Sequence, residues 1–213
     1  MTMKIFRQTF SPIQVNTYIL QGEGDECIII DCGCYDKSEE DQMEAFIESN
    51  RLSPVMLINT HCHLDHVFGN AFIFNRYGLK TRADKNDYYN LTTAPDHARL
   101  FGLSMENPPA PGESLTDNEK IVAAGIHFEA LSVPGHTSGS MAFYFPAQGA
   151  VFTGDALFAG SIGRTDLEGG NYETLIKSIK TKLFTLPDET MVYPGHGPGT
   201  TIGREKKTNP FFV

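Results

Sequence analysis

The sequence has 213 residues, of which 40% are hydrophobic and 20% charged, a composition typical of a globular protein long enough to bury one sizeable core. Its formal net charge of -9 at pH 7 repels nucleic acid and anionic membrane surfaces, so neither is expected as a partner. The amino terminus lacks the apolar core of a signal peptide, and no apolar run is long enough to span a bilayer, so a cytoplasmic protein is expected.

The first third of the chain contains several runs of β-branched and aromatic residues that end in turn-forming or polar residues. These runs predict a meander of strands over 3–10, 15–20 and 27–31. A further apolar strand is predicted over 55–58, and it leads directly into a histidine-rich segment. The histidines therefore lie at the carboxyl end of that strand, where open α/β sheets commonly place their functional sites.

Between these strands, residues 38–50 have the pattern of an amphipathic helix. Ser38 is the predicted N-cap, acidic residues fill the first turn, and Met43, Phe46 and Ile47 recur at helical spacing. A helix with one apolar face is expected to pack against a sheet.

All four cysteines fall in this first third, at Cys27, Cys32, Cys34 and Cys62. Their spacing matches no zinc ribbon and no disulfide framework, so they are interpreted as reduced thiols. Cys32 and Cys34 alone would make a poor site for a soft metal.

The second half repeats the alternation of strands and helix after a polar, proline-rich segment. Residues 84–118 are interpreted as an inserted flap with helical fragments at most. A helix with Asn171 as its N-cap is predicted over 171–184. The strands are predicted over 126–134, 140–146, 150–158 and 190–197. Sheet layers covered by helices, in one domain over 1–213, are the expected architecture.

The histidines gather at the ends of these strands. Three of the seven lie in one short segment, and His136 and His196 each follow another predicted strand, beside glycine. Asp155 also follows a strand and a glycine. The full set of candidate metal ligands is His61, His63, Asp65, His66, His136, Asp155 and His196. Seven imidazole and carboxylate donors exceed the needs of one tetrahedral ion and suit two divalent ions that share a carboxylate.

The sequence resembles the metallo-β-lactamase superfamily in four motifs, HCHLDH at 61–66, GHTSGS at 135–140, GDALF at 154–158 and GHGP at 195–198. The resemblance implies an αββα sandwich with the metal site at one edge of the sheets. It also implies that His61, His63 and His136 hold one metal ion. Asp65, His66 and His196 would then hold the second, and Asp155 would bridge the two. His97 and His127 match no motif and are expected not to be ligands.

Within that superfamily, the segments 157–170 and 200–211 resemble the glyoxalase II-like hydrolases, in particular the short bacterial form without a carboxyl-terminal helical domain. This resemblance implies hydrolysis of a thioester such as S-D-lactoylglutathione by a hydroxide that bridges two divalent metal ions. Zn²⁺ is the favoured metal, with Fe and Mn as alternatives. A thiol has a pKa of about 8.5, so a thiolate leaves without strong acid assistance. Asp65 would be a ligand, orient the hydroxide, or do both.

Basic residues near the motifs are candidates for binding an anionic small-molecule thioester. They are Arg164 in GRTD and Lys206 and Lys207 in GREKKTNP, which also contains Arg204. A structural ion pair for Arg164 and a solvated surface for the lysines are the alternatives. Asp31 either accepts the second ring N–H of a ligand histidine or serves as a turn residue. The oligomeric state is left open.

Other functions remain open on this scaffold. GRTD also occurs in the related persulfide dioxygenases, which bind a single iron with fewer of the same ligands. A phosphodiesterase or nuclease of the same superfamily is disfavoured by the acidic charge and by the lack of an RNA-gripping arm. A β-lactamase is disfavoured because His66 occupies the sixth position of the first motif. A binding module without activity is disfavoured because all seven donors are present.

Overall fold

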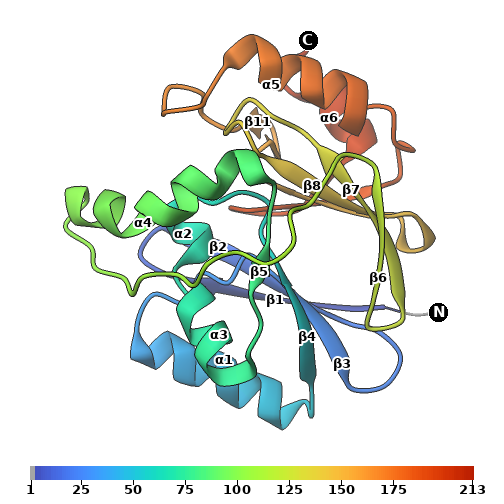
Figure 1. Ribbon diagram of the computed structural model, residues 1–213. Coiled ribbons are helices and arrows are strands. Elements are labelled where there is room, and N and C mark those ends of the chain that lie inside the picture. The colour runs from blue at the N-terminus through green and yellow to red at the C-terminus, as the bar shows by residue number, and fades with distance from the viewer. Residues whose placement is uncertain (1–2) are drawn as a thin grey trace.

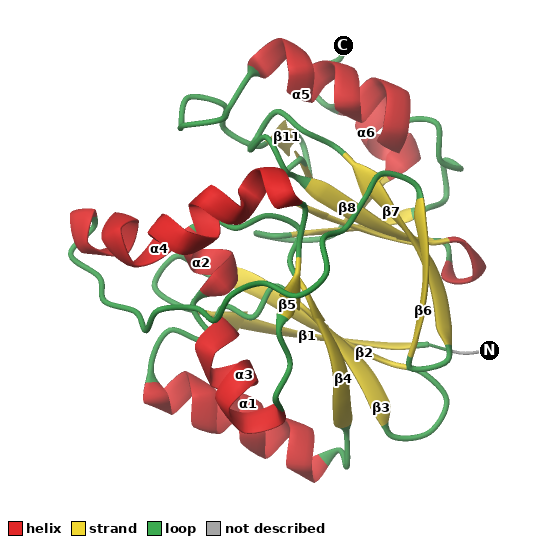
Figure 2. Cartoon of the chain, viewed as in Figure 1, coloured by secondary structure: helices red, strands yellow, loops and turns green. Residues whose placement is uncertain are grey.

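Two facing sheets, covered by helices on their outer surfaces, form the protein in a computed structural model that describes residues 3–213 (Figure 1). The strand order is β1-β2-β3-β4-β5 in the first sheet and β13-β12-β9-β8-β7-β6 in the second. A separate two-stranded ribbon joins β10 (Leu157–Phe158) and β11 (Ser161–Ile162). Figure 2 shows helices on the two outer faces and the strands between them, which confirms the predicted αββα sandwich.

The first sheet begins as the predicted antiparallel meander and then becomes parallel. β1 pairs antiparallel with β2 and β2 with β3, whereas β3 and β4, and then β4 and β5, are parallel. The strands are β1 (Lys4–Phe10), β2 (Val15–Gln21), β3 (Glu26–Ile30), β4 (Ser53–Ile58) and β5 (Thr81–Arg82). Since β3 and β4 are parallel neighbours, the residues that follow them lie at the same edge of the sheet.

Alternation of side chains along β3 and β4 explains why this sheet is covered on both faces. Ile28, Ile30 and Ile58 face the cluster between the two sheets. Ile29 and Leu57 face the opposite way, toward the helices. Successive residues of a strand point to opposite faces, so a continuous apolar run is what a sheet buried on both sides requires.

Helices α1 (Lys37–Ser49) and α3 (Asn70–Tyr77) cover the outer face of the first sheet (Figure 1). Met43 and Ile47 are the buried residues of α1, on the face that its spacing predicted. The predicted N-cap, Ser38, is wrong. Asp36 caps the helix instead, because its backbone is extended and its carboxylate accepts a hydrogen bond from Glu39 N–H at 3.0 Å.

The second sheet supplies large aromatic side chains to the inner core and packs its outer face on the carboxyl-terminal helices. Phe128, Phe143 and Phe152 belong to the inner cluster. Its strands are β6 (Glu119–Ala123), β7 (Ile126–Ser132), β8 (Met141–Phe145), β9 (Ala150–Gly154), β12 (Met191–Pro194) and β13 (Thr200–Thr201). The outer helices are α5 (Tyr172–Ser178), which continues as a π-helical turn over Ile179–Leu183, and α6 (Ile202–Thr208). Asn171 is the N-cap of α5, as predicted, and accepts from Thr174 N–H at 2.8 Å.

The interpretation that 84–118 holds helical fragments at most is wrong for its first part. After a 3₁₀ turn (Lys85–Asp87), helix α4 (Tyr88–Leu100) runs for 13 residues with Pro95 in its interior. A proline removes one helical hydrogen bond, but packing offsets that cost here. Leu91, Ala94 and Ala98 are buried against the short helix α2 (Leu64–Val67).

Among residues 3–213, no helix combines the length and the apolar character needed to cross a bilayer.

All four cysteines are buried and free, as their spacing predicted. The sulfur atoms of Cys32 and Cys34 lie 3.8 Å apart. The hydrogen bond with the Cys32 thiol, together with burial, raises the pKa of Cys34 well above its usual value, which disfavours a thiolate ligand.

Candidate metal centre

The seven residues singled out as candidate ligands converge at one edge of the two sheets. The turn between β4 and α2, together with α2 itself, contributes His61, His63, Asp65 and His66. His136 follows β7, Asp155 follows β9 and His196 follows β12. These seven residues are called the histidine–aspartate cluster below.

The donor atoms of this cluster form three overlapping groups. Within each group, one donor atom per residue lies within 4.8 Å of the others. The groups are His61, His63 and His136; His61, His66 and Asp155; and Asp65, His66 and His196. The first and third share no residue, so the cluster has donors for two separate ions.

Asp155 lies between those two groups. One carboxylate oxygen is 3.3 Å from His66 Nε2, and the other is 3.6 Å from His196 Nε2 and 3.7 Å from His136 Nε2. Its carboxylate therefore faces donors of both groups, the position that a bridging ligand requires.

The packing of the donors fits a bound cation. His136 Nε2 is 2.9 Å from His63 Nδ1 and 3.2 Å from His61 Nε2. His66 Nε2 and Asp155 Oδ1 are buried and have no hydrogen-bond partner within the described part of the chain. Buried polar atoms are otherwise almost always paired, so imidazole nitrogens and a carboxylate oxygen directed at the same space fit metal ions.

Three histidines of the cluster direct Nδ1 at an oxygen outside the cluster, and this contact determines which ring nitrogen faces the centre. The Nδ1 of His136 lies 2.8 Å from Arg164 O, and the Nδ1 of His196 lies 3.1 Å from Gln14 O. The Nδ1 of His66 lies 2.9 Å from an Asp31 oxygen. When Nδ1–H donates outward in this way, Nε2 is left free to bind a metal. Asp31 thus accepts the second ring N–H of a candidate ligand, the first of its two interpretations.

The pKa values of two histidines in the cluster are shifted in opposite directions. Burial alone would lower the pKa of His66, but the charges of Asp65, Asp31 and Asp155 raise it well above the usual value. Burial and the neighbouring imidazole of His136 lower the pKa of His63 to about 4. A histidine with so low a pKa is neutral at pH 7, which is the form that binds metals.

Close approach at the edge of the sheets depends on Gly195. A Cβ at this position would overlap Asp155 Oδ1 and would lie 2.7 Å from His66 Cε1. The glycine before His196 therefore lets two loops come together around the centre, which explains why a PGHG sequence ends β12.

Asp87, at the start of α4, joins the loops that carry the motifs at 61–66 and 135–140. Its carboxylate accepts the backbone N–H of Cys62 at 2.7 Å and of Gly139 at 3.0 Å, and the hydroxyl of Thr137 at 3.0 Å. The side chain is fully buried. Sequence reasoning missed this residue because nothing in DKNDYYN distinguishes Asp87 from Asp84, which is only partly buried.

The family model described as "Metallo-beta-lactamase superfamily" matches residues 11–196, which include all seven residues of the cluster. The chain belongs to this superfamily. The match confirms the family that the four sequence motifs indicated.

Curated relatives of this superfamily member cover nearly its whole length. A protein of Bacillus subtilis named "Probable metallo-hydrolase YqgX" is 36% identical over 98% of this chain and 97% of its own. "Hydroxyacylglutathione hydrolase GloC" of Haemophilus influenzae is 37% identical over 93% of this chain and 92% of its own. Membership and these relatives support a metal-dependent hydrolase.

Solved structures of the superfamily share the fold but carry different descriptions. The BLEG-1 B3 metallo-beta-lactamase has a TM-score of 0.91, with 30% identity over 99% of this chain and 100% of its own. TTHA1623 in a di-iron-bound form has a TM-score of 0.87, with 40% identity over 97% of this chain and 99% of its own. ETHE1 from Myxococcus xanthus has a TM-score of 0.77, with 28% identity over 97% of this chain and 83% of its own. The fold of this superfamily member therefore does not by itself select one reaction.

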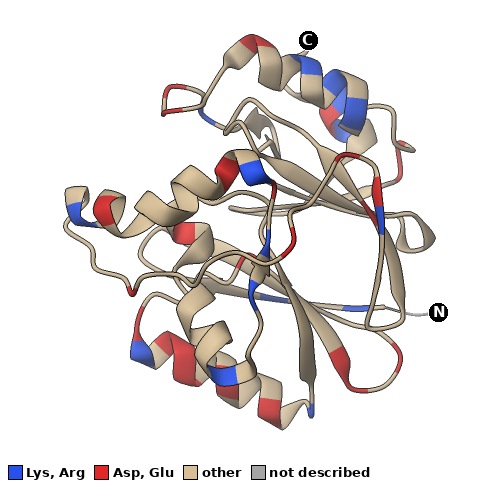
Figure 3. Cartoon of the chain, in the orientation of Figure 1, with Lys and Arg blue, Asp and Glu red and all other residues tan. Residues whose placement is uncertain are grey.

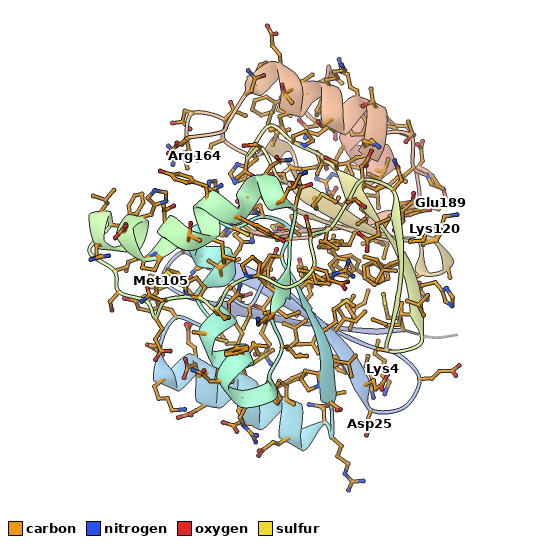
Figure 4. All side chains as sticks on the ribbon, viewed as in Figure 1. Lys4, Asp25, Met105, Lys120, Arg164 and Glu189 are labelled. Carbon is orange, nitrogen blue, oxygen red and sulfur yellow. The ribbon has the colours of Figure 1, made fainter. Side chains whose placement is uncertain are left out.

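The basic residues proposed for substrate binding lie in different places. Arg164 lines the cavity over the cluster, and Figure 4 shows it above α4, but its guanidinium binds Asp166 through Nε at 2.7 Å and Nη2 at 2.8 Å. Lys206, on α6, binds Asp188 at 2.6 Å and Leu186 O at 3.3 Å. Lys207 and Arg204 are exposed on the same helix. Among residues 3–213, those that line the cavity include Arg164 but none of these three α6 residues.

Helix α4 supplies cavity residues that the sequence did not point to. His97, expected not to be a ligand, belongs to none of the donor groups found among residues 3–213, but it lines the cavity together with Asn90, Leu100 and Phe101. The spacing of Leu91, Ala94 and Ala98 was the available signal for this helix.

Proposed function

We propose that this protein is a binuclear metal-dependent hydrolase that cleaves a small-molecule thioester. The observation that carries the proposal is the position of Asp155, whose carboxylate lies between two groups of donors that share no residue. When bound, two divalent ions would lower the pKa of a water to near neutrality and polarise a carbonyl group. Zn²⁺ is the proposed metal. Iron is the main alternative, supported by the di-iron-bound form of a structural relative.

The residues of the chain hold and orient this centre. In the proposed assignment His61, His63 and His136 hold one ion, Asp65, His66 and His196 hold the other, and Asp155 contacts both. The proposal gives Asp65 a second role. It is mostly buried, lies 3.1 Å from His196 Nε2, and lines the cavity, so it is also placed to orient a nucleophilic water.

A thioester suits this centre because of its leaving group. A thiol has a pKa of about 8.5 and leaves as the thiolate with little help from an acid, whereas an amine or alkoxide needs a proton. The name of the Haemophilus influenzae relative, a hydroxyacylglutathione hydrolase, supports the same reaction class.

The test is hydrolysis of S-D-lactoylglutathione by zinc-loaded protein, followed by the loss of thioester absorbance. Asp155→Ala should lose turnover, and Asp25→Ala, at an exposed turn, should retain it. Two metal ions per chain should be found by elemental analysis, and fewer in Asp155→Ala. These results would support the binuclear thioesterase.

Three other results would contradict the proposal. Hydrolysis of a chromogenic β-lactam without turnover of any thioester would favour a lactamase. One tightly bound iron per chain with oxygen uptake on glutathione persulfide would favour the dioxygenase. Cleavage of RNA or of a phosphodiester, without thioester turnover, would favour the nuclease.

A further inference from the structure

A cavity of about 590 Å³ opens directly over the histidine–aspartate cluster. Its volume lies within the range of about 300–1,000 Å³ that is usual for small-molecule sites. The cluster contributes one side of the lining through His63, Asp65, His136, Asp155 and His196. A thioester whose carbonyl lies at the cluster would therefore extend its remaining atoms along the other side of the same cavity.

That other side is largely apolar and comes from three separate segments. Ile13 lies in the turn after β1, Leu100 and Phe101 end α4, and Leu167 lies in the loop before α5. The four side chains, called the apolar wall below, are exposed by 41% for Ile13, 82% for Leu100, 67% for Phe101 and 37% for Leu167. Large apolar side chains gathered at one concave surface mark a binding site more often than chance exposure does.

Charge in the cavity does not favour an anionic carrier. Among the lining residues of 3–213, Arg164 is the only lysine or arginine, and its guanidinium is already paired with Asp166 through two hydrogen bonds. Glu168 adds a negative charge to the same lining. Figure 3 shows α4 mostly uncharged, while the α5 and α6 layer above it in this view carries several Lys and Arg residues together with Asp and Glu. A thiol with two carboxylates, such as glutathione, would meet no unpaired lysine or arginine among these lining residues.

We propose that the preferred substrate is a thioester with an apolar arm that packs on Ile13, Leu100, Phe101 and Leu167. This inference rests on the proposed thioesterase function and specifies the substrate class for that cavity. The arm belongs to either the acyl group or the thiol, because the cavity wall recognises its apolar surface in both cases. Burial of several methylene groups against the wall should improve binding by about tenfold or more relative to a short polar arm.

The first experiment compares four thioesters that combine two acyl groups with two thiols. The acyl groups are D-lactoyl and hexanoyl, and the thiols are glutathione and the neutral N-acetylcysteamine. A rise of about tenfold in kcat/KM for hexanoyl over D-lactoyl on the same thiol would place the apolar arm in the acyl group. A neutral apolar thiol, benzyl mercaptan, paired with D-lactoyl would show the same gain if the arm belongs to the thiol.

Variants link the preference to the wall. Leu100→Ala combined with Phe101→Ala should raise KM for the apolar thioester about tenfold, and should raise it much less for the lactoyl thioester of N-acetylcysteamine, which has no apolar arm. Both side chains are exposed, so the fold should tolerate the change. Val122→Ala is the matched control, since Val122 is 60% exposed on β6 and does not line the cavity.

A binding measurement separates this inference from the proposed function. Calorimetry with the protein as isolated compares the non-hydrolysable thioethers of N-acetylcysteamine that carry a hexyl or a methyl group. Tighter binding of the hexyl compound, lost in the double variant, supports the apolar wall even if no thioester is hydrolysed, in which case only the proposed reaction fails. Equal binding of the two thioethers, or a kcat/KM that is highest for S-D-lactoylglutathione and unchanged in the double variant, would overturn the inference.

Discussion

The Nδ1 atom of His66 lies 2.9 Å from a carboxylate oxygen of Asp31, in a contact that is buried from solvent. The same carboxylate accepts from Thr60 N–H at 2.8 Å and from the Thr60 hydroxyl at 2.6 Å. Asp31 has a φ of 54°, in the left-handed region where aspartate and asparagine are tolerated better than most residues. The turn after β3 therefore places a charged acceptor behind a candidate metal ligand that comes from α2.

Replacing Asp31 by asparagine should weaken metal binding without unfolding the protein. Asparagine tolerates the same φ, but it removes the charge that holds the His66 ring, and outer contacts of this kind contribute about 10- to 100-fold to metal affinity. Competition with a chromophoric chelator measures the affinity. Asp25→Asn, at an exposed position, is the matched control. An Asp31→Asn protein that binds both ions as tightly as wild type would show that this contact does not support the centre.

Asp87→Asn should lower both stability and metal affinity, because one carboxylate joins the loops of the first two motifs. An amide would place an NH₂ group against donors that now share the carboxylate, including the N–H groups of Cys62 and Gly139. Leaving a buried donor unpaired costs about 1–3 kcal/mol. Denaturant unfolding of the metal-free protein measures the loss. Asp96→Asn, on the exposed face of α4, should change the free energy of unfolding by less than about 0.5 kcal/mol. Equal stability of Asp87→Asn and wild type would contradict the anchoring role.

Metal affinity should rise with pH through the neutral range. Burial alone would lower the pKa of His196, but its hydrogen bond to Asp65 and the charge of Asp155 raise it, and the pKa of His66 is also raised. In the metal-free protein these two histidines therefore keep their protons above pH 6.5, and an incoming ion must displace them. His63, with a pKa of about 4, has no proton to lose at neutral pH.

Chelator competition between about pH 6 and pH 9 checks this linkage, and calorimetry at pH 7 in two buffers of different ionisation enthalpy counts the protons released. Affinity that is constant from about pH 6 to pH 8, with equal heats in both buffers, would mean that the histidines are already neutral.

The fold was largely predictable because its two sheets are buried on one or both faces and their strands are strongly apolar. Ile28, Ile29 and Ile30 form a run that only a covered strand explains, and the histidines directly after β4 marked the edge where the centre lies. Parallel pairing of β3 with β4 brings Asp31 next to His66. No single sequence motif contains both residues of this contact.

Other features depended on contacts between segments far apart in the chain. The polar, proline-rich composition of 84–118 predicted helical fragments at most, whereas burial of Leu91 and Ala98 against α2 stabilises the 13-residue helix α4. Asp36 and Ser38 are both residue types that cap helices, and the sequence alone did not distinguish between them. Asp36 is the N-cap in the structure. The apolar wall forms because the end of α4 and the loop that holds Leu167 line the same cavity, and no local sequence pattern predicts that arrangement.

Removing the positive charges of α6 should have little effect on substrate binding. Lys206 and Lys207 were candidates because GREKKTNP accompanies the family motifs, but Lys206 is engaged with Asp188 on the outer helical layer. A surface ion pair of this kind contributes about 0–1 kcal/mol, and its field at the cavity is screened by salt. Lys206→Ala combined with Lys207→Ala should therefore change KM for the best thioester by less than about twofold at physiological ionic strength.

Arg164→Ala is the contrasting variant, because its side chain lines the cavity. Steady-state kinetics at low and at physiological salt separates direct contact from long-range attraction. A KM that rises about tenfold in the lysine variant at both salt concentrations would show that α6 contacts the substrate after all.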